Sequence, residues 1–244
     1  KAIKTITFLM DQIARRDNPT EIAAVTRDEP MIEVEKFVKD MPGIGGKEAE
    51  TRLEDVFPHL REIKQLVSMR NHAEAVRRLL YLRSQHPDIA EIHAILGQCY
   101  MEMGRIDDAA KCFEDAVAVQ PDHAEALNGL AYIMATRVEN LDIALKYINQ
   151  ALAVDGLRAE FHHTLGWVHF KTGEVQKSID AFNRALELKP NYMLARYNLG
   201  LANYISQNFP AAIAAFNAVL SLNPTHHKAL LFKAISLAKT QNAE

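Results

Sequence analysis

Apolar residues recur at intervals of three and four along most of the chain, which is the spacing that places them on one face of an α-helix. From residue 56 onward these stretches come in pairs, in which a short polar turn separates a first helical run from a second. Several second runs stop at a proline, at Pro121, Pro190 and Pro224, because proline cannot continue a helix. The pattern predicts an all-α protein built from helix pairs.

The pairs are copies of one another with a period of 34 residues. Residues 124–158 form a copy that is one residue longer, with the extra residue near positions 138–140, and residues 56–89 form a weaker copy. Three copies share the same offsets, at Leu96, Gly97, Tyr100, Ala109, Phe113, Ala116 and Pro121; at Leu165, Gly166, His169, Ser178, Phe182, Ala185 and Pro190; and at Leu199, Gly200, Asn203, Ala212, Phe216, Val219 and Pro224.

Helix packing explains why these residue types recur. Glycines such as Gly97 let the two helices of a pair cross closely, and phenylalanines such as Phe113 are expected to fill the gap to the neighbouring pair. One pair cannot bury its apolar face alone, so stacking of successive pairs has to supply the core.

These offsets resemble those of the tetratricopeptide repeat (TPR) family. The resemblance implies a right-handed superhelical solenoid of helix pairs over residues 56–244, preceded by an N-terminal helical extension over residues 1–55. The expected parts of the array are 56–89, 90–123, 124–158, 159–192, 193–226 and a terminal helix at 227–244.

The N-terminal extension offers two further features. Ile3, Ile6, Met10 and Ile13 recur at helical spacing, so an amphipathic helix is expected near the start of the chain. Residues 38–53 resemble a helix-hairpin-helix motif whose turn, at 42–47, would face a nucleic-acid phosphate. The acidic neighbours of this turn would repel a phosphate backbone, so a plain glycine-rich turn is favoured and nucleic-acid binding is an alternative function.

Composition narrows the choice of function. The formal net charge is -3 and no part of the chain is basic, which argues against a large phosphate-binding surface. Cys99 and Cys112 have no spacing typical of a metal site, so both are expected to be reduced and buried. No apolar run is long enough to span a membrane, and a cytoplasmic location is expected. The chain starts at Lys1, so an upstream signal or anchor is left open.

No catalytic motif is recognisable, so we expect a protein that is not an enzyme and that uses no cofactor and no metal. Histidines are numerous, and His162, His163 and His169 invite comparison with a metal site. His93, His162 and His169 fall on positions that the repeat usually fills with core aromatics, so packing inside the array is the expected role.

The TPR resemblance also implies a concave groove lined by the first helix of each pair. An apolar or amphipathic peptide or helix of a partner protein is its expected occupant. The alternatives are that the aromatic residues only pack against neighbouring helices, or that the chain forms a homo-oligomer as a self-assembling scaffold of a bacterial envelope, secretion, pilus or magnetosome system. The expected groove residues are Gln98, Asn128, Tyr132, His163, Trp167, Phe170, Tyr197, Asn198, Leu201, Tyr204, Leu231 and Ile235.

Overall fold

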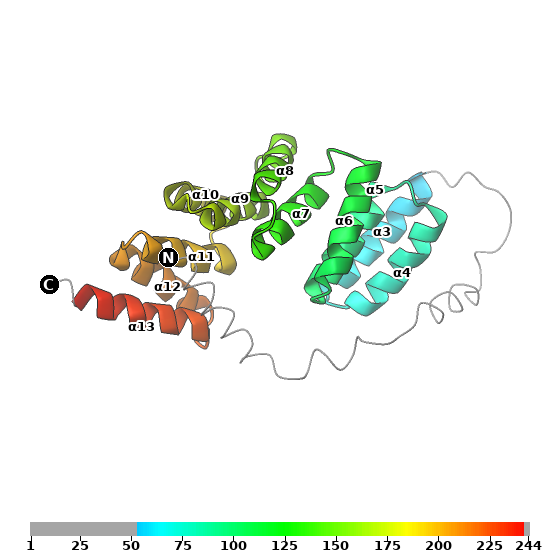
Figure 1. The fold of residues 1–244 in the computed structure, drawn as a ribbon. Helices are drawn as coiled ribbons and strands as arrows, with labels where there is room; N and C mark the ends of the chain where they lie inside the picture. The colour runs from blue at the N-terminus through cyan, green and yellow to red at the C-terminus, as the bar shows by residue number, and fades with distance from the viewer. Residues whose placement is uncertain (1–52, 242–244) are drawn as a thin grey trace. The chain divides into compact units, whose positions relative to one another are not determined.

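A computed structural model describes residues 53–241 of the chain (Figure 1). The helices expected in residues 1–52 and the glycine-rich turn at 42–47 lie outside the described residues. Within the described range the regular structure consists of helices α3 to α13, without a strand. The prediction of an all-α fold of paired helices is therefore confirmed.

The chain divides into two compact units between Gln120 and Pro121, and each is described here by itself. The N-terminal unit contains α3 (Leu53–Ser68), α4 (His72–Gln85), α5 (Ala90–Glu102) and α6 (Ile106–Val119). The C-terminal unit contains α7 (Ala124–Arg137), α8 (Leu141–Val154), α9 (Ala159–Thr172), α10 (Val175–Leu188), α11 (Met193–Ile205), α12 (Phe209–Leu222) and α13 (His227–Gln241).

The N-terminal unit packs its four helices as neighbours in chain order, with α5 and α6 in the most extensive contact (Figure 1). Its core contains Ile63 of α3, Leu79 of α4 and Leu96 of α5, all fully buried. Cys99 and Cys112 are also buried, and no disulfide joins them. The two thiols therefore act as small apolar side chains of this core.

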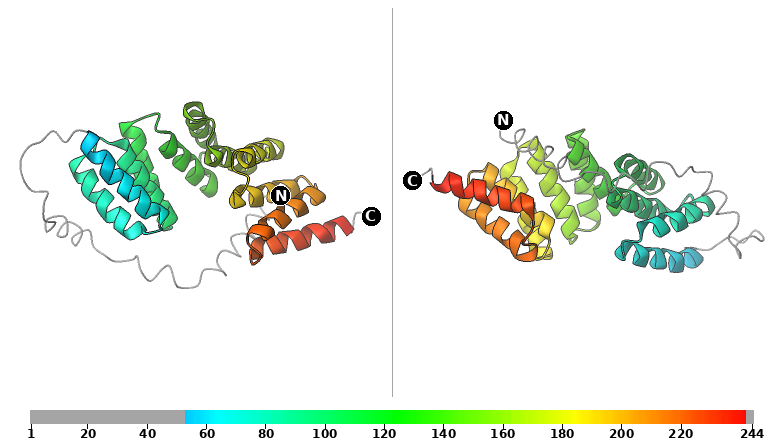
Figure 2. Two further views of the ribbon diagram at one scale, coloured as in Figure 1. Left: turned by 180° about the vertical axis from the view of Figure 1, so that it is seen from behind. Right: turned by 90° about the horizontal axis from the view of Figure 1, so that it is seen from below.

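In the C-terminal unit, α7 pairs with α8, α9 with α10 and α11 with α12, while α13 packs against α12. Both further views show these helices as successive layers that end at α13, drawn in red (Figure 2). Each first helix also contacts the first helix of the next pair, most extensively α7 with α9. The first helices of this unit thus follow one another along one side of it.

The glycines at the shared offset are points of close approach between the two helices of their pairs. A Cβ atom placed on Gly166 would lie 2.6 Å from the ring of Phe182, and one on Gly200 would lie 2.6 Å from the ring of Phe216. Each phenylalanine therefore packs first on the glycine of its own pair. The expectation that it fills the gap to the neighbouring pair holds in addition for Phe216, whose ring lies 6.1 Å from that of Phe232 in α13.

The extra residue near positions 138–140 changes the turn between α7 and α8. Val138 and Asn140 both have a positive φ, of 59° and 47°. The α9–α10 turn contains one such residue, Gly173 with a φ of 86°. The longer copy thus places its extra residue in a turn that passes through the left-handed region twice, once at a β-branched side chain for which that conformation is costly.

Candidate functional site

The residues predicted to line a groove all lie on first helices, namely α5, α7, α9, α11 and α13. Gln98 belongs to the N-terminal unit, where its amide donates to Glu102 Oε1 at 3.0 Å, and the other residues belong to the C-terminal unit. Their exposure differs widely. Leu231 is exposed; Asn128, Tyr132, Tyr204 and Ile235 are half-buried; and His163, Trp167, Phe170, Tyr197, Asn198 and Leu201 are buried.

These side chains connect neighbouring first helices in sequence. The indole N–H of Trp167 in α9 donates to Thr136 Oγ1 of α7 at 3.2 Å. The side-chain amide nitrogen of Asn198 in α11 lies 2.9 Å from His163 Nε2 of α9. Tyr204 of α11 then meets Phe232 of α13 edge to face, with ring centroids 5.9 Å apart. These contacts link α7, α9, α11 and α13 one after another, and we call the predicted residues of these four helices the inner row.

Trp167 is only 8% exposed, so most of its ring takes part in packing. The ring stacks on Phe170 with centroids 5.4 Å apart and planes 6° apart. The ammonium group of Lys171 lies 4.5 Å from the Trp167 ring centroid, which is a cation–π contact. Trp167 thus joins α7 to α9, and its use as an anchor for a partner stays a prediction.

His163 is the most deeply placed titratable group of the inner row, and burial lowers its pKa from 6.5 to about 4. The nearby carboxylate of Glu160 opposes this shift more weakly. The imidazole is therefore neutral near pH 7, and its Nε2 accepts a hydrogen bond from Asn198. Tyr192, the residue just before α11, packs against His163 with ring centroids 5.2 Å apart.

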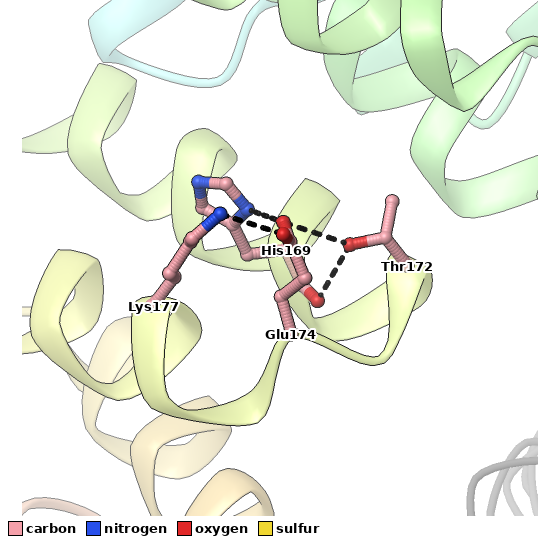
Figure 3. Close-up of polar contacts among 4 residues, drawn as sticks. All are labelled: His169, Thr172, Glu174 and Lys177. Atoms are coloured by element: carbon pink, nitrogen blue, oxygen red, sulfur yellow. Dashed lines mark hydrogen bonds and ion pairs between the residues drawn. The ribbon is translucent and has the colours of Figure 1, made fainter.

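His169 takes part in a polar cluster at the corner between α9 and α10 (Figure 3). Its Nδ1 lies 2.6 Å from Glu174 Oε2, and the other carboxylate oxygen accepts from Lys177 Nζ at 2.6 Å. These two partners, Lys177 first, lower the pKa of the Glu174 carboxyl. The hydroxyl of Thr172 donates to the His169 carbonyl oxygen at 3.0 Å, so the cluster holds together the turn that contains Gly173.

The three histidines considered as metal ligands have separate partners. His162 Nε2 lies 2.9 Å from the Gly156 carbonyl oxygen, while His163 pairs with Asn198 and His169 with Glu174. Among residues 53–241, no group of three or more His, Cys, Asp or Glu side chains is placed to hold a metal ion. In the same range no helix is long and apolar enough to cross a membrane.

Sequence reasoning missed two residues that shape the inner row. Thr136 accepts the indole N–H of Trp167, and Tyr192 packs against His163. Thr136 follows Tyr132 by four residues, so its place on the same helix face was readable from the sequence. Tyr192 lies outside any helix, in the turn before α11, where helical periodicity gives no signal.

Comparison with known proteins agrees with the paired helices. Family models described as tetratricopeptide repeat or TPR repeat match residues 66–133, 166–205 and 190–227. None of them covers residues 38–53, so the resemblance of that segment to a helix-hairpin-helix turn is not borne out.

Among curated proteins, the human Protein O-mannosyl-transferase TMTC1 is 31% identical over 101 residues, which are 41% of this chain and 11% of that protein. The chain spans between about a tenth and a third of the length of three curated relatives that it matches.

Two solved structures illustrate the likeness of fold. PilW, described as a widely conserved type IV pilus biogenesis factor, superposes with a TM-score of 0.64 at 18% identity, covering 74% of this chain and 85% of its own. YrrB, described as a TPR protein with an unusual peptide-binding site, superposes with a TM-score of 0.53 at 20% identity, covering 76% of this chain and 95% of its own. At these identities the likeness concerns the fold alone. The family matches and the helix pairs together show that the chain belongs to the tetratricopeptide repeat superfamily.

Proposed function

We propose that the chain is a protein-interaction scaffold that holds an apolar or amphipathic segment of a partner protein along the inner row of its C-terminal unit. TPR proteins generally mediate protein–protein interaction and are typically not enzymes. The proposal adds the place and the chemistry of the contact, and it assigns no catalytic step to the chain.

The observation that carries the proposal is the continuity of the inner row. Hydrogen bonds and ring contacts join α7 to α9, α9 to α11 and α11 to α13. A surface made of consecutive first helices can contact an extended peptide or a helix over several turns, which is more than a single helix pair offers. The buried members of the row give this surface a fixed shape.

The side chains that remain accessible set the chemistry of the occupant. Leu231 is 44% exposed, and Tyr132, Tyr204 and Ile235 are half-buried. These are aromatic and aliphatic groups. Their burial against a partner lowers the free energy by about 25 cal/mol for each Å² of apolar surface removed from water. An apolar or amphipathic segment therefore fits the row better than a strongly charged one. The description of YrrB as a TPR protein with an unusual peptide-binding site is in keeping with a peptide as the occupant.

The test uses accessible members of the row, because alanine at Trp167 or Tyr197 would remove buried packing and cost about 3–5 kcal/mol of stability. The variant Asn128→Ala/Ile235→Ser removes two half-buried side chains, one in α7 and one in α13. A matched control, Asn183→Ala/Asn217→Ala, changes two exposed side chains of the second helices α10 and α12.

The measurement is affinity capture from lysate of the source organism, with captured proteins identified by mass spectrometry. We expect at least one protein to be captured by the wild type and the control, and to be lost with the inner-row variant. Equal capture by all three folded proteins would place the binding surface elsewhere and overturn the proposal.

A further inference from the structure

Helices α5, α7, α9, α11 and α13 begin in one of two ways. In α5, α9 and α11 a long polar side chain in the fourth position of the helix bonds to the carbonyl oxygen six residues before it, a contact that we call the turn bond. The three turn bonds join His93 to Pro87, His162 to Gly156 and Arg196 to Pro190. The N-cap side chains of these helices accept no hydrogen bond from the first turn. The turn bond is therefore what holds the start of these helices to the preceding turn.

Helices α7 and α13 begin in the other way. Their fourth positions hold Leu127 and Leu230, which cannot form the turn bond. A histidine stands at the N-cap of each instead. His123 Nδ1 accepts a backbone N–H of the first turn of α7 at 3.4 Å, and His226 Nδ1 accepts that of Ala229 at 3.1 Å. In these two helices a histidine cap thus replaces the turn bond.

The two arrangements require histidine in opposite forms. A carbonyl oxygen can only accept, so Nε2 of His93 and of His162 must carry a hydrogen, and it still does when the ring takes up a proton. A backbone N–H can only donate, so Nδ1 of a capping histidine must be without a hydrogen. Protonation turns this Nδ1 into a donor and places a positive charge at a helix N-terminus, where the helix dipole disfavours it. The turn bond therefore persists in acid, and the histidine cap does not.

The two histidine caps differ in the charges near them. His123 Nδ1 lies 3.8 Å from Glu125 Oε2, and this carboxylate would pair with a protonated ring. His226 has no such neighbour in the sequence, because residues 188–243 contain no Asp or Glu. Acid should therefore act on the cap of α13 more strongly than on the cap of α7.

The helices packed around His226 offer it no negative charge. The Tyr197 ring of α11 lies 5.2 Å from the His226 ring, and burial raises the pKa of this phenol, which stays neutral. The charged side chain of α11 is Arg196, and α12 has none. Helix α13 itself adds His227 and Lys228 next to the cap. Because the ring of His226 is only half-buried, a protonated ring can turn to water, and it leaves the cap open when it does.

We propose that His226 is an acid-sensitive cap of α13, whose neutral ring closes the first turn of the helix and packs on Tyr197, and whose protonation releases both contacts. Helix α13 carries Leu231 and Ile235 of the inner row, so this end of the row loses its fixed start in mild acid, while the turn bonds of α5, α9 and α11 persist. This goes beyond the binding function proposed above, because it concerns the folded chain by itself and holds whether or not a partner binds.

Nuclear magnetic resonance of the full chain tests both parts of the proposal between pH 7.5 and pH 5, where histidine usually changes charge. The ring ¹⁵N shifts of His226 report its protonation, and the ¹³Cα shifts of Lys228, Ala229 and Leu230 report how helical the first turn is. In the wild type we expect the helical shifts to fall together with the titration of the ring, since loss of a cap lowers the ratio of closed to open turn about fivefold. The first turn of α5 should keep its helical shifts.

Three variants separate the cap from its proton. His226→Asn keeps an oxygen that can accept the Ala229 N–H, as Asn208 does at the start of α12 at 3.3 Å, so the first turn of α13 should stay helical at both pH values. His226→Ala should show at pH 7.5 the open turn that the wild type shows at pH 5. His227→Gln, which removes the exposed neighbouring imidazole, should behave like the wild type.

Several results would overturn the proposal. One is a His226 ring that stays neutral down to pH 5, and another is a ring that titrates while the first turn of α13 stays helical. An equal loss of helical shifts in His226→Asn would also overturn it. So would a loss of helical shifts in α12 at the same pH, because the change would then be unfolding of the whole C-terminal unit.

Discussion

The buried histidine of the inner row makes the stability of the C-terminal unit depend on pH in a predictable direction. His163 is 2% exposed and is enclosed by the rings of Tyr132, Phe182 and Tyr192. Protonation would place a charge in this apolar pocket and would put a second donor opposite the amide group of Asn198. Burial accordingly lowers the pKa of His163 from 6.5 to about 4.

The sign follows from linkage between proton binding and folding. Between pH 6.5 and pH 4 the unfolded chain binds a proton at this residue and the folded chain does not, so the free energy of unfolding falls as the pH is lowered through that window. Because one pKa unit is worth about 1.4 kcal/mol, the full effect is roughly 3 kcal/mol, of which about 2 kcal/mol is lost by pH 5.

Urea unfolding followed by circular dichroism at pH 7 and pH 5 measures the effect. His163→Gln keeps a polar side chain beside Asn198 and removes the titrating group, so this variant should lose about 2 kcal/mol less than the wild type between the two pH values. His227→Gln is the matched control, since it removes an exposed imidazole of α13 that water solvates in both states. Equal losses in the wild type and His163→Gln would refute the assignment.

Three shorter predictions concern packing, backbone strain and reactivity. Gly200→Ala should lower the free energy of unfolding by about 1–3 kcal/mol, because the new Cβ would lie 2.6 Å from the Phe216 ring. A double-mutant cycle with Phe216→Leu should show a coupling energy above about 0.5 kcal/mol, and additive effects of the two substitutions would contradict the contact. Val138→Gly should raise the free energy of unfolding in urea by up to about 1 kcal/mol by relieving a positive φ of 59°, and a loss would contradict the strain. Burial raises the pKa of the Cys99 thiol to about 12. At pH 8 this thiol should therefore react with a thiol reagent only as fast as the protein unfolds, and rapid labelling of the native protein would contradict its burial.

The periodic part of the sequence predicted the fold because each repeated residue type is required by one local packing or helix-ending contact. Gly166 and Phe182 recur at a fixed spacing since the first must be small for the second to pack on it. Pro121 and Pro190 mark the ends of second helices, because neither can continue a helix. Because these contacts lie within one helix pair, the pairs could be predicted from the local sequence without knowledge of the rest of the chain.

The site was harder to predict because exposure depends on several helices at once. Trp167 and Tyr197 were assigned to a groove from register, yet both are less than a tenth exposed, since neighbouring helices cover them. The hydrogen bond between His163 and Asn198 joins residues 35 apart in the sequence, and its geometry follows from how α9 and α11 stack.

Site-specific photo-crosslinking in cells of the source organism tests the central claim, partner binding along the inner row, most directly. A photoreactive phenylalanine analogue is placed at Asn128 or Ile235 in the inner row and, as controls, at the exposed Asn183 or Asn217 of the second helices. We predict that irradiation yields the same protein adduct from both inner-row positions and none from the controls. Adducts from the control positions alone, or none from any position, would contradict the claim.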